Sequence, residues 1–311
     1  MTHHHLKSSP ETCHWGIFDA TLPPVLTVQS GDTVTIETIS GGPDVMPPAP
    51  YEVLPELREV HAKVPRGPGH ILTGPVRVEG AMPGDVLEIQ VLAVEPRQDW
   101  GWMAIRPLRG TLPEDFHEQT LAHYPIDKAA GVTRMPWGMS IPLAPFFGVM
   151  GVAPPRAWGR IDTIVPRDHG GNIDLKEMQA GATLYLPVWV EGANFSTGDG
   201  HGVQGDGEVC LTALETAMTG TFRLVVRKDL SFRFPRAETP THLITLGLNE
   251  DLDDAAKQAL REMIALIVER TNISREQAYM LCSLAVDLRV TQTVDGNKGI
   301  HAMLAKSLLA G

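Results

Sequence analysis

The chain has 311 residues, a net charge of −11 and an apolar fraction of 43%, which is ordinary for a soluble globular protein. This length predicts one large unit or two closely packed ones. The negative charge and the lack of a basic stripe argue against a nucleic-acid partner, and no apolar run is long enough to span a membrane. Three widely spaced cysteines fit a reduced setting better than a disulfide framework, so we expect a cytoplasmic protein.

Strands are predicted through most of the first 240 residues. Glycine-centred turns precede runs rich in β-branched residues at 33–37, 86–91 and 182–190. In the first run, Val34 and Ile36 alternate with polar residues, which is the pattern of a half-buried strand. Residues 99–155 are rich in proline and aromatic residues, so we expect an irregular segment there with a functional or oligomer-contact role.

The last part of the chain predicts two helices. Met263 and Ile267 recur with other apolar residues at helical spacing, and the acidic run 251–254 suits the start of that helix. Ser274 and Gln277 form a capping-box pattern that opens a second helix. Further strands are expected at 222–226, 242–248 and 290–294. We therefore expect a mainly β fold with an α+β C-terminal part: a body at 1–240 that carries the site loops, and a dependent part at 241–311 packed on it.

The most distinctive stretch, residues 198–208, holds five glycines between an expected strand at 182–190 and an apolar run at 209–214. Asp199 and His201 are two residues apart, so an extended backbone points both to the same side, where they can share a metal ion. Asp206 and Glu208 repeat this spacing, and the two pairs can hold one metal or two. Mixed oxygen and imidazole ligands suit zinc, manganese or iron, and an oxygen-only subset suits calcium or magnesium. The alternative is a solvated glycine–aspartate turn that binds nothing.

A second polar cluster spans residues 166–174. Gly170 and Gly171 permit close approach of the backbone to a ligand, and their N–H groups can polarise a carbonyl oxygen. The alternative is a turn in which Asp174 caps the segment 175–177, and the residues alone leave both open.

Two isolated residues are ambiguous. His70 precedes an expected strand, where a lone histidine is more often a surface residue than a ligand. Glu215 lies at odd spacing from Glu208 in the same expected strand, so it should face the opposite side unless a bulge intervenes. The chain lacks a Gly-x-Ser-x-Gly elbow and a phosphate loop, and Cys210 lies in an apolar run, so covalent catalysis is poorly supported.

Taken together, these motifs resemble the acetamidase/formamidase family. The matching stretches are His-x-x-Thr-Gly-Pro at 70–75, Val-x-Gly-Ala-x-Pro-Gly-Asp at 78–85, Gly-Gly-Asn-x-Asp at 170–174, Leu-Pro-Val at 186–188 and Gly-Asp-x-His…Gly-Asp-Gly-Glu at 198–208. Similar stretches occur near both ends, so the resemblance covers essentially the whole chain. The combined signature is specific, although no single piece is.

This resemblance implies hydrolysis of short amides to ammonia and a carboxylate, and it implies a homodimer, which is frequent in the family. It also implies a jelly-roll-like β-sandwich body and a divalent metal, for which we expect zinc, with calcium as the candidate for a second ion. Small lactams are an alternative substrate class for the same scaffold. A metal-dependent small-molecule binding protein without catalysis is the alternative from another class.

The residues and the resemblance together lead to a hypothesis for the roles. The metal ligands are expected to be Asp199, His201, His70 and Asp206, and Glu208 is expected to act as the general base, with a role as metal ligand as the alternative that spacing leaves open. Asn172 and the backbone of Gly171 are expected to stabilise the tetrahedral oxyanion. Four further residues are expected to contact the substrate or support the ligands: His169, Asp174, Glu79 and Glu215.

Overall fold

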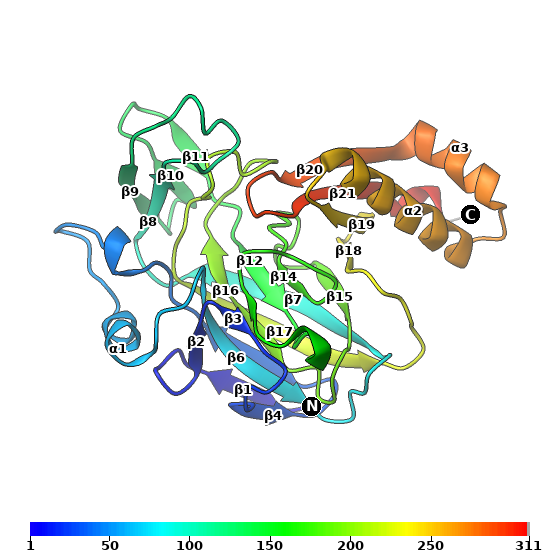
Figure 1. Cartoon of the computed structure of the whole chain (residues 1–311), viewed down its shortest axis with the longest axis horizontal. Coiled ribbons are helices and arrows are strands. Elements are labelled where there is room, and N and C mark those ends of the chain that lie inside the picture. The colour runs from blue at the N-terminus through cyan, green and yellow to red at the C-terminus, as the bar shows by residue number, and fades with distance from the viewer. Residues whose placement is uncertain (310–311) are drawn as a thin grey trace.

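The computed structural model describes residues 1–309. Two β-sheets pack face to face at its centre, and a smaller sheet (β8 to β11) and a helix pair (α2 and α3) lie on opposite sides of the view in Figure 1. The mainly β fold with a sandwich body and a C-terminal helix pair is therefore confirmed. None of the sheets formed by the described residues closes into a barrel.

The larger sheet has nine strands in the order β1-β5-β17-β7-β15-β18-β19-β21-β20. All neighbours are antiparallel except β1 and β5. The bounds are β1 His3–Leu6, β5 Thr33–Glu37, β17 Met218–Arg227, β7 Val86–Pro96, β15 Thr183–Pro187, β18 Arg236–Glu238, β19 His242–Asn249, β21 Lys298–Ala305 and β20 Val286–Gln292.

The facing sheet has six strands, in the order β14-β12-β16-β6-β2 with β4 parallel to β6. Their bounds are β14 Gly170–Asn172, β12 Phe146–Gly151, β16 Phe195–His201, β6 Ile71–Val78, β2 Cys13–Trp15 and β4 Leu26–Val28; a separate ribbon pairs β3 Ile17–Phe18 with β13 Ile161–Asp162. Phe222 of the large sheet lies between Phe147 and Phe195 of the smaller one, with ring centroids 5.5 and 5.6 Å away. The interior between the two sheets is the main hydrophobic core.

The glycine-centred turns carry the chain from one sheet to the other. Gly31 (φ 94°) lies between β4 and β5, and Gly84 (φ 97°) lies between β6 and β7. In each case the strand before the turn is in the six-stranded sheet and the strand after it is in the nine-stranded one. These turns thus build the sandwich rather than local hairpins, because each strand finds its partners far away in sequence.

The expectation of an irregular segment at 99–155 is wrong. Residues 100–142 contain the four strands of a third sheet, in which Trp100, Tyr124 and Ile126 are buried. Prolines within short strands, such as Pro125 and Pro142, obscure the alternation that would have revealed it. The strands are β8 Trp100–Ile105, β9 Thr120–Asp127, β10 Val132–Arg134 and β11 Ser140–Pro142.

The two C-terminal helices are confirmed and begin with the expected caps. The Asp251 carboxylate accepts hydrogen bonds from two backbone N–H groups at the start of α2 (Leu252–Arg270). Ser274 and Gln277 form the capping box of α3 (Arg275–Ala285). Helix α2 packs closely against β19. A Cβ on Gly247 would come within 1.9 Å of a helix carbonyl oxygen, so this close approach requires glycine. The remaining helices are α1 (Pro55–Lys63) and the short 3₁₀ turns η1 (Pro43–Val45), η2 (Arg156–Trp158) and η3 (Lys306–Leu308).

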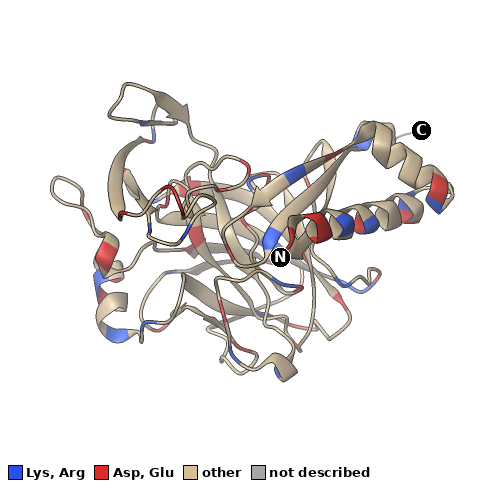
Figure 2. Cartoon of the chain, turned by 45° about the horizontal axis from the view of Figure 1, so that its top comes forward, with Lys and Arg blue, Asp and Glu red and all other residues tan. Residues whose placement is uncertain are grey.

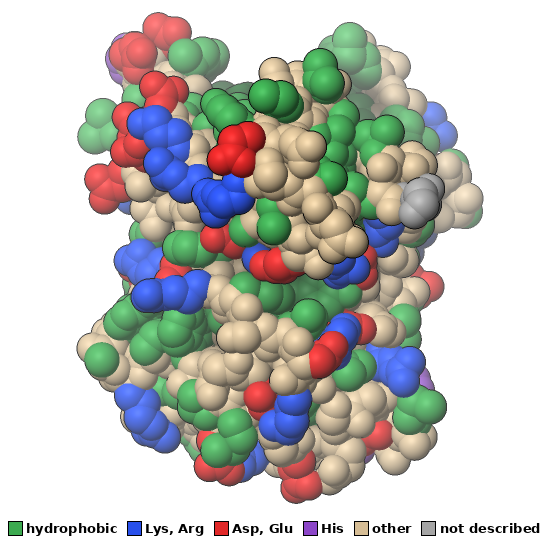
Figure 3. Space-filling model, turned by 90° about the vertical axis from the view of Figure 1, so that its right-hand side faces the viewer, with side chains coloured by type: hydrophobic (Ala, Val, Ile, Leu, Met, Phe, Trp, Pro, Cys, Tyr) green, Lys and Arg blue, Asp and Glu red, His purple; other side chains and the backbone are tan. Residues whose placement is uncertain are grey.

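Charged residues of both signs occur along the helix layer. Acidic and basic residues follow each other along α2 (Figure 2). The face viewed in Figure 3 likewise shows both signs of charge beside hydrophobic side chains. In residues 1–309, no helix combines the length and apolar character needed to cross a bilayer.

Candidate active site

The glycine-rich stretch begins as a buried strand. Gly198 and Gly200 are required by close packing in β16: a Cβ on Gly198 would lie 2.4 Å from the Ile71 carbonyl oxygen, and one on Gly200 would lie 2.2 Å from Met218 Cγ. Asp199 between them has a φ of 58°, a left-handed conformation that few residues other than glycine adopt. The alternation of glycines with Asp199 and His201 therefore lets two polar side chains occupy a crowded interior.

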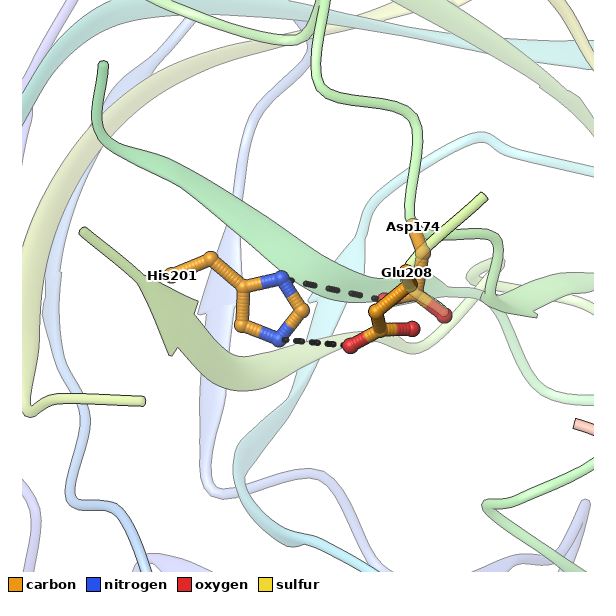
Figure 4. A group of neighbouring side chains, drawn as sticks. All are labelled: Asp174, His201 and Glu208. Atoms are coloured by element: carbon orange, nitrogen blue, oxygen red, sulfur yellow. Dashed lines mark ion pairs between the residues drawn. The ribbon is translucent and has the colours of Figure 1, made fainter. Parts of the chain in front are cut away.

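His201 lies at the centre of the site, with carboxylates near both of its ring nitrogens. Its Nε2 lies 3.2 Å from Asp199 Oδ2, 3.3 Å from Glu215 Oε1 and 4.0 Å from Glu208 Oε1. Its Nδ1 lies 2.8 Å from Gln204 Oε1 and 4.0 Å from Asp174 Oδ1. Figure 4 shows the two ring nitrogens facing the carboxylates of Asp174 and Glu208, which come from different segments.

Gln204 fixes the orientation of the imidazole. Its side-chain N–H donates to the Asp174 carbonyl oxygen at 2.9 Å, which leaves Oε1 to accept a hydrogen bond from His201 Nδ1. Because Nδ1 donates to Gln204, Nε2 is the ring nitrogen that faces the carboxylates of Asp199 and Glu215. This arrangement is typical of a metal-binding histidine held by a supporting hydrogen bond.

The centre holds more acids than bases. Five buried carboxyl groups surround His201, whereas the only other nearby base among the described residues is His70, whose Nε2 is 3.7 Å from Asp199 Oδ2. The five are Asp174, Asp199, Glu208, Glu215 and Asp295.

The pKa values reflect this crowding. Burial raises the pKa of Glu215, and burial together with neighbouring carboxylates raises those of Asp174, Glu208 and Asp295 well above the usual range. Burial also disfavours the charge of Asp199, but His70 and His201 outweigh it and lower that pKa. Burial opposes protonation of His201, yet Glu215 and Asp199 hold its pKa well above the ordinary value. A bound cation would offset the unfavourable charge of so many buried carboxylates.

Two overlapping groups of side chains could bind a metal ion. Asp199, His201 and Glu215 each offer a ligand atom within 4.8 Å of the others, and so do Asp174, His201 and Glu208. Within the described part of the chain, His201 Nε2, Glu215 Oε2 and both Asp174 carboxylate oxygens are buried without a hydrogen-bond partner. Unpaired buried polar atoms are costly, so these residues fit a divalent metal.

The expectation that Glu215 shares a strand with Glu208 and faces the opposite side is wrong. Residues 209–214 do not form a strand; they make a loop between Glu208 and Glu215. Glu215 forms isolated bridges with His201 and Trp102, and Gly207 bridges to Gln292. Both glutamates therefore face His201, because a loop rather than a strand separates them.

A cavity of about 340 Å³ opens onto this centre. Asp199, Glu208, Glu215 and His70 line it, together with Asn172. The Asn172 side-chain N–H donates to the Ile164 carbonyl oxygen at 3.2 Å, and its Oδ1 has no partner among the described residues. Gly171 is buried in β14 and is not one of the lining residues.

Other expected site residues lie elsewhere. Asp206 pairs with Lys176 Nζ at 2.8 Å, and Glu79 is an exposed residue that accepts a hydrogen bond from Gln29. His169 is buried against Phe18 and Trp158, and burial lowers its pKa to about 3.

Asp295 and Gln204 also belong to the site, although neither is among the residues expected from the sequence. Gln204 lies inside the glycine-rich stretch three residues after His201. Asp295 follows β20, some ninety residues along the chain, and no local pattern connects it to the site.

The fold and the centre define a class: a β-sandwich protein with a buried carboxylate–histidine cluster that fits a divalent metal. The sequence profile of the acetamidase/formamidase family matches residues 5–160 and 157–305, and the chain belongs to that family.

Solved structures and curated sequences show similar proteins. An acetamidase from Bacillus halodurans is 35% identical, with 98% of each chain covered and a TM-score of 0.86. A formamidase from Methylophilus methylotrophus is 29% identical over 252 residues, and the match spans 61% of each protein. A gamma lactamase from Delftia acidovorans is 23% identical, with a TM-score of 0.66 over 98% of this chain and 93% of its own, and shares the fold.

Proposed function

We propose that this protein hydrolyses short aliphatic amides of the formamide and acetamide type. In this reaction the C–N bond breaks, a C–O bond to water forms, and the products are a carboxylate and ammonium. The observation that carries the proposal is the His201 centre, which combines metal-ligating and proton-accepting groups at a cavity. The names of the related acetamidase and formamidase support the substrate class.

Asp199, His201 and Glu215 are the proposed metal-binding residues, with His70 beside Asp199. This mixed oxygen and nitrogen set suits zinc. The second group, which adds Asp174 and Glu208, is richer in oxygen and is the candidate position for a second ion such as calcium. A bound divalent metal supplies activation of a water molecule and polarisation of the amide carbonyl.

Glu208 is the proposed proton carrier. It is buried, and its pKa is raised well above that of an ordinary glutamate, so its carboxylate is a stronger base than usual. It can accept a proton from the attacking water and pass it to the amide nitrogen, which leaves readily only when protonated. Its position 4.0 Å from His201 Nε2 places it beside the proposed metal ligand.

Asn172 is the proposed group that orients the amide. One N–H of its side chain is used by Ile164, which leaves the second N–H for the substrate. This N–H can stabilise a developing oxyanion.

Ammonia release from formamide, acetamide, propionamide and a bicyclic lactam tests the proposal. The assay is run with and without a chelator, alongside elemental analysis of the purified protein. Turnover of the linear amides that is lost with chelator supports the proposal. Chelator-insensitive turnover would refute the metal role, and turnover of the lactam alone would assign the other substrate class. Binding of amides without ammonia release would show a non-catalytic binding protein.

A further inference from the structure

The cavity has two ends of opposite charge. The buried end holds the carboxylates around His201, whereas three arginines lie at the exposed end: Arg66, Arg106 and Arg109. The Arg66 side chain is 56% exposed and that of Arg106 is 39% exposed, so both reach solvent. A molecule that enters the cavity meets the guanidinium groups before it meets the acids.

Asp44 forms ion pairs with two of the three arginines. Asp44 Oδ1 lies 2.8 Å from Arg66 Nη2, and Asp44 Oδ2 lies 3.4 Å from Arg106 Nη2. In residues 1–309, Arg109 has no carboxylate within 4.0 Å. Three positive charges therefore face one negative charge. Gly42 leaves room for this pairing, because a Cβ there would lie 2.7 Å from Asp44 Oδ1.

The cavity is also larger than the simplest amides require. Its volume of about 340 Å³ is roughly ten times the share of one water molecule in the liquid, whereas acetamide has only four non-hydrogen atoms. Its walls also include the apolar side chains of Ile39, Ile71, Trp102 and Leu211. A cavity that combines acidic, basic and apolar walls suits a substrate with a hydrocarbon spacer between two polar groups.

We infer that the preferred substrate is an amide whose acyl chain ends in a carboxylate, which the arginines Arg66, Arg106 and Arg109 bind. This inference rests on the proposed function, because it places the amide group at His201. Guanidinium groups match carboxylates in geometry and charge. The reaction then converts the monoamide of a dicarboxylic acid and water into a dicarboxylate and ammonium.

Three pairs of substrates test the inference. Malonamate, succinamate and glutaramate are each compared with the neutral amide of equal chain length: propionamide, butyramide and valeramide. We expect kcat/KM to be at least about tenfold higher for the charged member of the best pair. Arg109→Gln and Arg106→Gln should each lower that charged-to-neutral ratio about tenfold, and added salt should also lower it. Arg261→Gln, on the exposed face of α2, is the matched control and should leave the ratio unchanged.

Binding of the product gives an independent measurement. Glutarate should bind more tightly than valerate by calorimetry, and the difference should shrink in Arg109→Gln. If the protein hydrolyses acetamide but shows no preference in any pair, the inference is wrong and the proposed function stands. If none of the amides, including formamide, releases ammonia, the proposed function itself has failed.

Discussion

Among residues 1–309, two clusters contain a histidine and two carboxylates with ligand atoms within 4.8 Å of one another, and their surroundings differ. In the His201 centre, five carboxyl groups face two imidazoles at a cavity. In the second cluster, formed by Glu177, Asp206 and His301, the acids already have basic partners.

The second cluster is balanced in charge. Lys176 Nζ lies 2.8 Å from Asp206 Oδ1, Arg289 Nη1 lies 3.7 Å from Glu177 Oε1, and His301 Nε2 lies 3.4 Å from Glu177 Oε2. None of these residues lines the cavity. A set of donor atoms is therefore not sufficient for a metal site. The His201 centre differs from the second cluster in its excess of unpaired negative charge and in its access to a cavity.

The largest expected contrast is in activity. Asp199→Asn should lower kcat/KM for acetamide by at least about 10³-fold, because it removes a charged ligand from the proposed metal-binding set. Asp206→Asn should change kcat/KM less than about threefold, because it disrupts an ion pair with Lys176 outside the cavity. Steady-state kinetics of the two variants, with metal content measured on both, checks this. Equal losses would mean that both clusters take part in the reaction.

Glu208→Gln separates proton transfer from metal binding. We expect kcat to fall by about 10² to 10⁴-fold, the usual contribution of a general base, while the zinc content at Asp199, His201 and Glu215 stays at the wild-type level. Loss of the metal together with activity would make Glu208 an essential ligand. Full activity would remove it from the mechanism.

Removal of the metal should lower stability as well as activity. Ligand at a hundred times its dissociation constant stabilises a folded protein by about 2.7 kcal/mol, so chelation should lower the Tm measured by calorimetry. The Asp199→Asn variant should show a smaller chelator-dependent shift. An unchanged Tm in the wild type would argue against a bound metal at the His201 centre.

The smallest expected effects concern the pH dependence of the metal-free protein. The folded-state pKa of Glu208 is raised, so its ionisation destabilises the fold as pH rises above the ordinary value of 4.5 and through the raised pKa. Burial opposes ionisation of Glu177, but His301 outweighs it and lowers the pKa, so the contribution of Glu177 is present above pH 4.5 and lost as pH falls through the folded pKa.

Two glutamine variants test these opposite signs. At pH 7, Glu208→Gln should stabilise the metal-free protein by about 1 to 3 kcal/mol, and Glu177→Gln should destabilise it by a similar amount. Chemical denaturation at pH 5 and pH 7 measures both. Shifts of the same sign in the two variants would show that the two clusters do not differ in charge balance.

Several features could be predicted from local patterns. The alternation of Val34 and Ile36 predicts β5, and the caps at Asp251 and Ser274 predict α2 and α3. The third sheet could not be predicted in this way, because β9 and β11 contain prolines and β10 and β11 are only three residues long.

The closeness of Asp199 and His201 follows from the chain alone, because two residues separated by one position in a strand are close in space, even though Asp199 has a left-handed φ of 58°. The glycines that flank them can also be read from the sequence, and the packing of β16 against Ile71 and Met218 requires them. Which carboxylates join them depends on tertiary contacts. Glu215 lies next to His201 because the two residues form an isolated β-bridge. Asp295 belongs to a segment near the C-terminus that is paired with Gly207. Such contacts depend on how distant strands pair, so residue spacing along the chain does not encode them.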